Sequence, residues 1–251
     1  MSPMARDGRR SRRLRTIAGE IERCERCPRL REWCRRVGRE KRRAYADETY
    51  WAKPVPGFGD PEATVVVVGL APGAHGANRT GRLFTGDRSG DFLYASLHRT
   101  GFANQSEATS RDDGLVLSGA FISAAGRCAP PANRPTPEEL AACRPFLVRE
   151  LEVLEPRVLV ALGGLAWNAT LAALADLGLG EAIPRPKPRF AHAAETTIGD
   201  ARIGDTRIGD TRIGEITLLG AYHPSQQNTF TKRLTPPMLD AVFLRAREIA
   251  G

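Results

Sequence analysis

Four of the five cysteines have a spacing that suits a metal site. Cys24 and Cys27 form a C-x2-C pair just before a proline, and 14 residues separate Cys128 from Cys143. Four thiolates can bind zinc, but zinc sites usually use two tight pairs. A second pair that spans a proline loop and a helix start favours a bulkier [4Fe–4S] cluster. The alternative is unrelated core cysteines, and Cys34 is left over in either case.

His223 is a candidate for acid–base or electrostatic chemistry. It follows directly on a strand expected over residues 216–221, and Pro224 and Ser225 hold it in a turn. A lone histidine is more often structural, but here the side chain can point into a site beyond the strand. It can then donate a hydrogen bond, or carry positive charge, to stabilise an anion that develops there.

A long glycine-rich loop at residues 69–87 follows four consecutive valines, Val65 to Val68. An uninterrupted β-branched run indicates a strand buried on both faces, and ligands bind beyond the carboxyl ends of such strands. The loop has neither the G-x-G-x-x-G dinucleotide pattern nor a phosphate-binding Gly-Lys-Ser/Thr. A long loop of this kind is more often functional than an ordinary connection.

Alternating strands and helices must position these residues. Further strands are expected over residues 120–124, 157–162 and 216–221, with helices to about Arg99, from Thr136 to about Leu154, from 163 to 177 and from 236 to 250. The order predicts an α/β protein with three αβα layers around a central, mainly parallel four-stranded sheet. The loops after residues 69, 125 and 221 then share one edge and one site.

Charge and composition complete the outline. Residues 1–43 hold sixteen Lys and Arg and six Asp and Glu, a local net charge of +10 against +8 for the whole chain. Such a basic region suggests a nucleic-acid partner, although a solvated tail fits equally well. We expect a disordered basic tail at residues 1–12, one domain over 13–251 and a mobile low-complexity insertion at 198–214. With no membrane-spanning segment or secretory signal, a cytoplasmic location follows.

Together these motifs resemble the uracil-DNA glycosylase superfamily. The chain carries Gly-Leu-Ala-Pro-Gly from Gly69, Gly-Arg-x-Phe-Thr-Gly from Gly81, the four spaced cysteines and a late His-Pro-Ser-x-x-Asn. Within the superfamily they are similar to family 5, the type B iron–sulfur enzymes. The resemblance implies a uracil-DNA glycosylase-like fold, a [4Fe–4S] cofactor and a monofunctional hydrolase of DNA repair.

The implied reaction is base excision. Such an enzyme flips a deaminated base out of DNA and hydrolyses its N-glycosidic bond, leaving an abasic site. The resemblance implies double- and single-stranded DNA as partners, uracil and other deaminated bases such as hypoxanthine as substrates, a monomer, and activity at the nucleoid. Other branches place an acidic residue or Asn where this chain has Ala71, and another reads uracil with an Asn where it has Ala124, so strict uracil specificity is not expected.

The same resemblance, read with the loop chemistry, assigns roles to individual residues. The catalytic candidates are His223 at the departing base, Asn78 to position water, and Asp87, which could instead cap a helix. The base-binding candidates are Ala71, Gly73, Phe84, Ala124 and Asn133. The DNA-binding candidates are Arg79, Arg82, Ser225, Gln226, Gln227, Asn228, Lys232 and Arg233. For each DNA-binding candidate the alternative is a solvated loop residue.

A second function remains open at this point. A non-catalytic DNA-binding module with a structural metal site of four cysteines would carry the same basic region and the same thiols. Iron with sulfide would favour the glycosylase, whereas zinc would favour the module.

Overall fold

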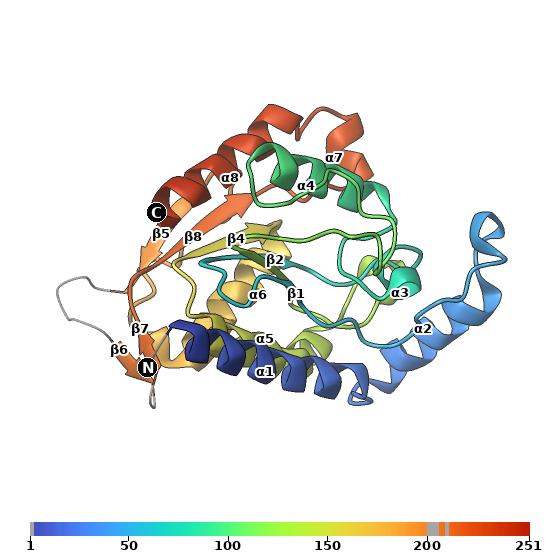
Figure 1. Ribbon diagram of the computed structural model, residues 1–251, viewed down its shortest axis with the longest axis horizontal. Helices are drawn as coiled ribbons and strands as arrows, with labels where there is room; N and C mark the ends of the chain where they lie inside the picture. Colours follow the sequence, from blue (N-terminus) through green and yellow to red (C-terminus); the bar gives the residue numbers. More distant parts are fainter. Residues whose placement is uncertain (1–2, 200–205, 209–210) are drawn as a thin grey trace.

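The computed structural model describes residues 3–199, 206–208 and 211–251 (Figure 1). Its helices are α1 (Pro3–Glu22), α2 (Pro28–Glu40), α3 (Ala77–Thr80), α4 (Arg88–Arg99), α5 (Pro137–Leu154), α6 (Gly164–Leu174), α7 (Gln226–Phe230) and α8 (Pro236–Ala250). Its strands are β1 (Phe58–Gly59), β2 (Val65–Gly69), β3 (Ala120–Ala124), β4 (Val158–Leu162), β5 (Glu195–Ile198), β6 (Thr206–Ile208), β7 (Thr211–Ile213) and β8 (Ile216–Ala221).

The central sheet has the strand order β1-β3-β2-β4-β8-β5. The four inner strands β3, β2, β4 and β8 pair in parallel, as predicted. Two short strands missing from the sequence prediction, β1 and β5, add antiparallel edges. The carboxyl ends of the four inner strands therefore lie at one edge of the sheet, where the loops after β2, β3 and β8 begin.

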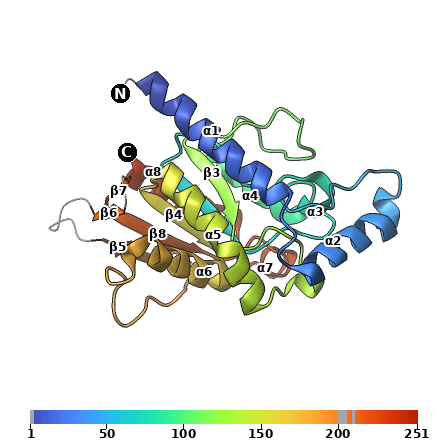
Figure 2. The same cartoon turned by 90° about the horizontal axis from the view of Figure 1, so that it is seen from below.

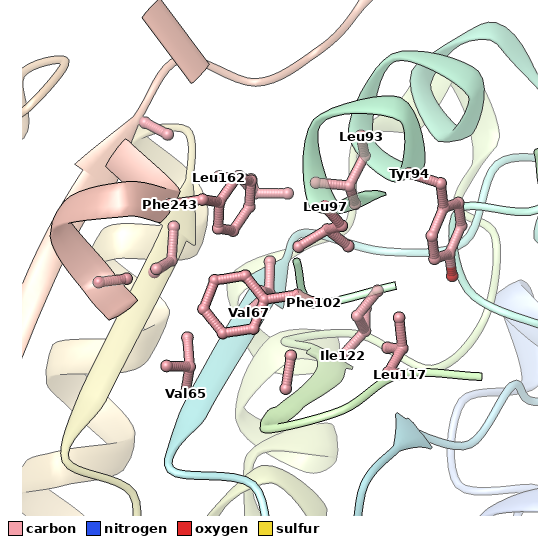
Figure 3. Packing of buried hydrophobic residues seen from close by; sticks show 14 of the residues in the cluster. Val65, Val67, Leu93, Tyr94, Leu97, Phe102, Leu117, Ile122, Leu162 and Phe243 are labelled. Atoms are coloured by element: carbon pink, nitrogen blue, oxygen red, sulfur yellow. The ribbon is translucent and has the colours of Figure 1, made fainter. Parts of the chain in front are cut away.

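Helices cover both faces of the sheet, which confirms the α/β, three-layer arrangement (Figures 1 and 2). Successive side chains of a strand point to opposite faces, and the valines of β2 divide accordingly. Val65 and Val67 pack with α4 and α8 in one apolar core, shown in Figure 3. Val66 and Val68 pack with α1, α5 and α6 in the other. The central strand is thus buried on both faces, as the β-branched run indicates.

Local sequence signals fix the helix starts next to the site. Thr136 accepts a hydrogen bond from the backbone N–H of Glu139, whose carboxylate accepts in return from the N–H of Thr136. This capping box starts α5 at the expected position. The carboxylate of Asp87 caps α4 by accepting from the backbone N–H of Gly90 at 3.0 Å.

The N-terminal region of the structure differs from what the sequence predicts. The expected disorder at residues 1–12 is replaced, from Pro3 onward, by helix α1. Leu14, Ile17 and Ile21 on α1 are buried against the core beside α5, and a helix anchored in this way extends toward its N-terminus at little further cost.

Within the insertion expected at residues 198–214, β6 and β7 form a separate antiparallel pair. The rest of that segment includes residues 200–205 and 209–210, which lie outside the described residues. Over the part of the chain that is described, the helices are too short or too polar to cross a bilayer.

Candidate active site

A cavity of about 550 Å³ opens at the edge of the sheet where β2, β3 and β8 end. The loop after β2 supplies most of its wall, and the segments after β3 and β8 supply the rest. The lining residues are Leu70, Ala71, Pro72, Gly73, Ala74, His75, Gly76, Leu83, Phe84, Asp87, Arg88, Ser89, Ala124, Pro130, Asn133, His223, Ser225, Gln226 and Gln227. The three loops thus share one site, as the parallel topology predicts.

His223 and Phe84 both line this cavity and lie close to each other. Their ring centroids are 6.0 Å apart and the ring planes are inclined by 36°. Burial lowers the pKa of His223 to about 4, so the imidazole is neutral at pH 7 and carries one N–H donor. The side-chain amide of Asn228 donates to the His223 carbonyl at 2.8 Å and holds the turn.

Phe84 needs the first glycine of the loop. A Cβ added at Gly69 would lie 2.8 Å from the Phe84 ring, too close for any other residue. Phe84 itself has a φ of +52°, a backbone conformation that a residue with a large side chain rarely adopts. The aromatic ring is therefore held against the end of β2 by the surrounding fold.

Asp87 places a carboxylate in the same cavity. One oxygen caps α4, while the other lies against the loop backbone, where a Cβ at Gly73 or Gly76 would come within 2.9 or 1.9 Å of it. Glycine at both positions lets the loop close over the carboxylate. Burial raises the pKa of Asp87 above its usual value. The cavity is therefore lined both by a carboxylate that can accept a proton and by the imidazole of His223.

Asn78 lies outside the lining of the cavity. Its side chain is completely buried, and its amide N–H groups donate to the carbonyls of Ala74 at 3.3 Å and Cys34 at 3.4 Å. This amide connects the glycine loop to α2. Its placement is that of a structural residue, and Asp87 takes the position beside the cavity that was expected for Asn78.

The positions of Arg79 and Arg82 differ most from the prediction that both side chains contact DNA. Both side chains are buried, and neither faces solvent where phosphates would pass. Arg79 pairs with Glu48, and Arg82 forms two hydrogen bonds to Asp113, at 2.8 and 2.6 Å. Their charges are already compensated, so they brace the glycine loop and are not phosphate ligands.

The remaining DNA-binding candidates surround the loop after β8. Ser225 caps α7 by accepting from the backbone N–H of Asn228, while Gln226 and Gln227 line the cavity and are exposed. Lys232 and Arg233 are exposed beyond α7, and the Arg233 guanidinium stacks over the Tyr222 ring at 4.6 Å.

His75 is a cavity residue for which the sequence predicted no role. Its Nδ1 lies 3.0 Å from the hydroxyl of Tyr50, which follows α2. Burial, together with Arg42 and Arg79, lowers the pKa of His75. A histidine inside the glycine loop was the only available signal, because the pairing with Tyr50 joins residues 25 positions apart.

The cysteines come from three separate segments. Burial raises the pKa of Cys27, and the neighbouring Cys143 and Cys24 raise it further. The pKa of Cys128 is raised by a hydrogen bond with Cys34, by burial and also by Cys143. Cys27 also packs on the small core that contains Cys34 and Cys128. Arg26 and Arg29, on either side of Cys27, donate to the Ala142 carbonyl and to Glu139 on α5, the helix that carries Cys143. The segments that carry Cys24, Cys27, Cys128 and Cys143 therefore lie side by side. No three metal-binding side chains among the described residues lie close enough to hold one ion. Four thiols are the donor set by which proteins hold iron–sulfur clusters.

Comparison with known proteins agrees with this geometry. Residues 56–247 match the family described as the uracil DNA glycosylase superfamily. A type-5 uracil-DNA glycosylase of Mycobacterium bovis is 48% identical over 230 residues, which cover 91% of this chain and 78% of that protein. The chain belongs to the uracil-DNA glycosylase superfamily. Type-5 uracil-DNA glycosylases of Thermus thermophilus and Pyrobaculum aerophilum are 48% and 42% identical, covering 91% of this chain and 94% or 89% of theirs.

The superfamily match contains the cavity but not all the cysteines. It begins after α2, so Cys24 and Cys27 precede it, whereas Phe84, Asp87 and His223 lie inside it. The type-5 uracil-DNA glycosylases named above match more than nine-tenths of the chain. The similarity to the type-5 uracil-DNA glycosylases therefore covers more of this chain than the superfamily match does.

Proposed function

We propose that this protein excises uracil from DNA by hydrolysing the bond between base and deoxyribose. The observation that carries the proposal is the meeting of an aromatic ring, a neutral imidazole and a partly buried carboxylate in one cavity, from Phe84, His223 and Asp87. The names of the type-5 relatives support uracil as the base.

In this reaction the base leaves as an anion with the electrons of the bond, the water oxygen joins the sugar carbon, and the proton that this water loses passes through the carboxylate of Asp87 to solvent. Phe84 stacks on the base after it has left the duplex. His223 donates a hydrogen bond to the base oxygen, where negative charge grows as the bond breaks. A neutral donor suits this role because the charge on the base is then stabilised without a proton transfer.

Asp87 is the group that we assign to the water. Its second carboxylate oxygen faces the cavity wall, and as an anion it both orients water and favours the positive charge that develops on the sugar. Asn78, buried between the loop and α2, keeps the loop in place.

Two alanines support a substrate range wider than uracil. Ala71 and Ala124 line the cavity with methyl groups, so neither offers an amide that would pair selectively with uracil. We propose that hypoxanthine is also excised. Gly73 and Asn133, also in the lining, complete the base pocket.

The DNA is held by the cavity rim. We propose that Ser225, Gln226 and Gln227 follow the flipped nucleotide into the groove and that the exposed Arg88, Lys232 and Arg233 contact phosphates. Asn228 supports them by holding the carbonyl of His223.

We propose that Cys24, Cys27, Cys128 and Cys143 hold a [4Fe–4S] cluster with a structural role. The four thiols approach from the junction of α1 and α2, from the loop after β3 and from α5. A group bound to all four would fasten the N-terminal helices to the rest of the domain. Loss of the brown colour and of iron in Cys128→Ser, with both retained in Cys34→Ser, is the expected result.

The function is tested with duplexes that carry one uracil, one hypoxanthine or only normal bases. With enzyme in excess, alkaline cleavage of the products reports abasic sites. We expect cleavage at uracil and hypoxanthine and none at normal bases. A protein that binds these duplexes but leaves uracil intact would be a binding module, and the proposal would be wrong.

A further inference from the structure

Five buried hydrogen-bond donors on three side chains have no partner among the described residues. They are the Nε and Nη1 atoms of Arg31, the Nε1 atom of Trp33, and the Nε and Nη1 atoms of Arg127. Buried polar groups in native proteins are almost always satisfied, so an unpartnered donor indicates a missing acceptor.

All three side chains flank the cysteines. Arg31 lies on α2, between Cys27 and Cys34, with its backbone N–H bonded to the Cys27 carbonyl at 3.0 Å. Trp33 and Cys27 pack on the small core that contains Cys34 and Cys128. Arg127 directly precedes Cys128 in the loop after β3. The donors thus lie on α2 and on the loop after β3, the two segments that also carry Cys34 and Cys128.

Arg31 is 3% exposed and Arg127 is 1% exposed, so water does not satisfy them. Arg31 uses only its Nη2 atom, which donates to the Ala52 carbonyl at 3.1 Å. Its nearest carboxylate, on Glu25, is 3.5 Å from Nε and is itself half exposed. Burying a guanidinium with so little compensation is costly unless further negative charge is present.

Arg127 is held rigidly by its other nitrogen. Its Nη2 atom donates to Glu150 at 2.6 Å and to Ser123 at 3.0 Å. Glu150 is 2% exposed and lies on α5, the helix that carries Cys143. This network fixes the guanidinium while leaving two of its donor atoms free.

We propose that Arg31 and Arg127 donate hydrogen bonds to the sulfur atoms of an iron–sulfur cluster on Cys24, Cys27, Cys128 and Cys143, and thereby raise its reduction potential. The proposal rests on the cofactor proposed above. A cluster with four thiolates carries net negative charge and many sulfur acceptors, and both charge and hydrogen bonds to sulfur set its potential. Reduction adds another negative charge, which positive donors stabilise. Both arginines are positioning residues, because neither is a ligand of iron.

The test is the midpoint potential of the cluster in protein purified without oxygen, measured by an electron-paramagnetic-resonance redox titration. Arg31→Leu removes the donor, and Arg35→Leu is the matched control, because Arg35 is one turn further along α2, half exposed and also paired with Glu25. We expect Arg31→Leu to shift the redox equilibrium at least tenfold toward the oxidised form, about 59 mV for one electron. Arg35→Leu should not change it, and Arg127→Lys, which keeps the charge next to Glu150, should cause a smaller shift in the same direction.

Iron and sulfide content separate the possible failures. Parent protein without iron overturns the cofactor together with this inference. Iron present at an unchanged potential in Arg31→Leu overturns the inference alone. If Arg31→Leu folds, as judged by circular dichroism, but loses iron that Arg35→Leu retains, the potential is measured on Arg31→Lys instead. If Arg31→Leu does not fold, Arg31→Lys decides: it should keep iron at a lowered potential, and the parent's potential would contradict the inference.

Discussion

His223 remains neutral over the whole physiological range because burial lowers its pKa to about 4. As a fixed donor at the departing base it stabilises charge that is absent from the bound substrate, so it acts on the chemical step. Removing one such donor typically costs ~3 kcal/mol, or about 100-fold in rate.

His223→Ala should therefore lose about 100-fold in the single-turnover rate of uracil excision, measured with enzyme in excess over a uracil duplex. Its affinity for the same duplex, measured by fluorescence anisotropy, should stay near that of the parent. A variant that cleaves uracil at the parent's rate would exclude His223 as the donor.

Asp87 makes the rate depend on pH. Burial raises its pKa, and only the ionised carboxylate can hold and activate water, so the rate should rise as the pH rises through that pKa and then level off. Asp87→Asn should lower the plateau and abolish the acid limb, because asparagine still caps α4 but does not ionise. The measurement is a pH profile of single-turnover excision. An unchanged acid limb in Asp87→Asn would assign the titration to another group.

At the scale of elements, the loop between β2 and α4 is held in shape by the ion pairs of two buried arginines, Arg79 and Arg82. Although burial raises the pKa of Asp113, hydrogen bonds from Arg82 and from the backbone N–H groups of Leu115, Thr109 and Ser110 bring it well below its usual range. The stability that this depressed pKa contributes is present above the unfolded pKa of Asp and is lost as the pH falls through the folded pKa.

Arg82→Met should consequently destabilise the protein by about 3 kcal/mol or more, because it leaves a buried carboxylate without its partner. The unfolding free energy from urea titrations measures this. Arg36→Met is the control, since Arg36 is half exposed and its contact with Glu40 is 3.9 Å long, and should cost less than about 1 kcal/mol. If Arg82→Met is as stable as the control, the ion pair is not structural.

The connection from β5 to β8 gives a second prediction at this scale. Ile198 pairs with Ile216 in an antiparallel register, so the two strands form a hairpin that a short turn can close. Replacing residues 200–214 by Asn-Gly should leave the melting temperature and uracil excision close to those of the parent, since loop length affects stability only weakly. A large drop in either would show that the segment contributes to the fold or to the site.

For the whole molecule, the positive charge on α2 lies closer to the cavity than the charge at the start of α1. Figure 1 shows α1 beginning at the end of the molecule opposite α3 and α7, whereas α2 runs beside α3. Tyr50, shortly after α2, contacts His75 in the cavity wall. The basic region expected from the sequence thus has two parts. The charges on α2 and shortly after it lie near the cavity, and the charges at the start of α1 lie far from it.

Neutralising three arginines at the end of α2 and just after it should weaken DNA binding and reduce its salt dependence, by up to about 0.9 in the log–log slope for each phosphate that is no longer neutralised. We suggest replacing by Gln the exposed residues Arg39, Arg42 and Arg43. The matched control replaces by Gln the exposed α1 residues Arg12, Arg13 and Arg15. Equal losses of affinity in both variants would mean that binding follows net charge and not position.

Local sequence signals were enough to predict the inner sheet and the edge at which the site lies. The valine run of β2 could only be a strand buried on both faces, and the capping box at Thr136 fixed the start of α5. Because parallel strands end at the same edge, Phe84, Asn133 and His223 had to converge there. The motifs also sufficed for the family, since the glycine loop and the His-Pro-Ser turn both lie within the superfamily match.

Which loop side chains face the cavity and which face the interior depends on contacts between distant parts of the chain. Arg82 and Asp87 are neighbours in one loop, yet one is buried against Asp113 and the other lines the cavity. Nothing in the local sequence distinguishes them, because Arg82 stabilises the loop only through Asp113, which lies 31 positions away in the sequence. The short edge strands β1 and β5 likewise depend on a neighbour that supplies their hydrogen bonds, and a strand as short as the two residues of β1 has too little periodicity to be recognised alone.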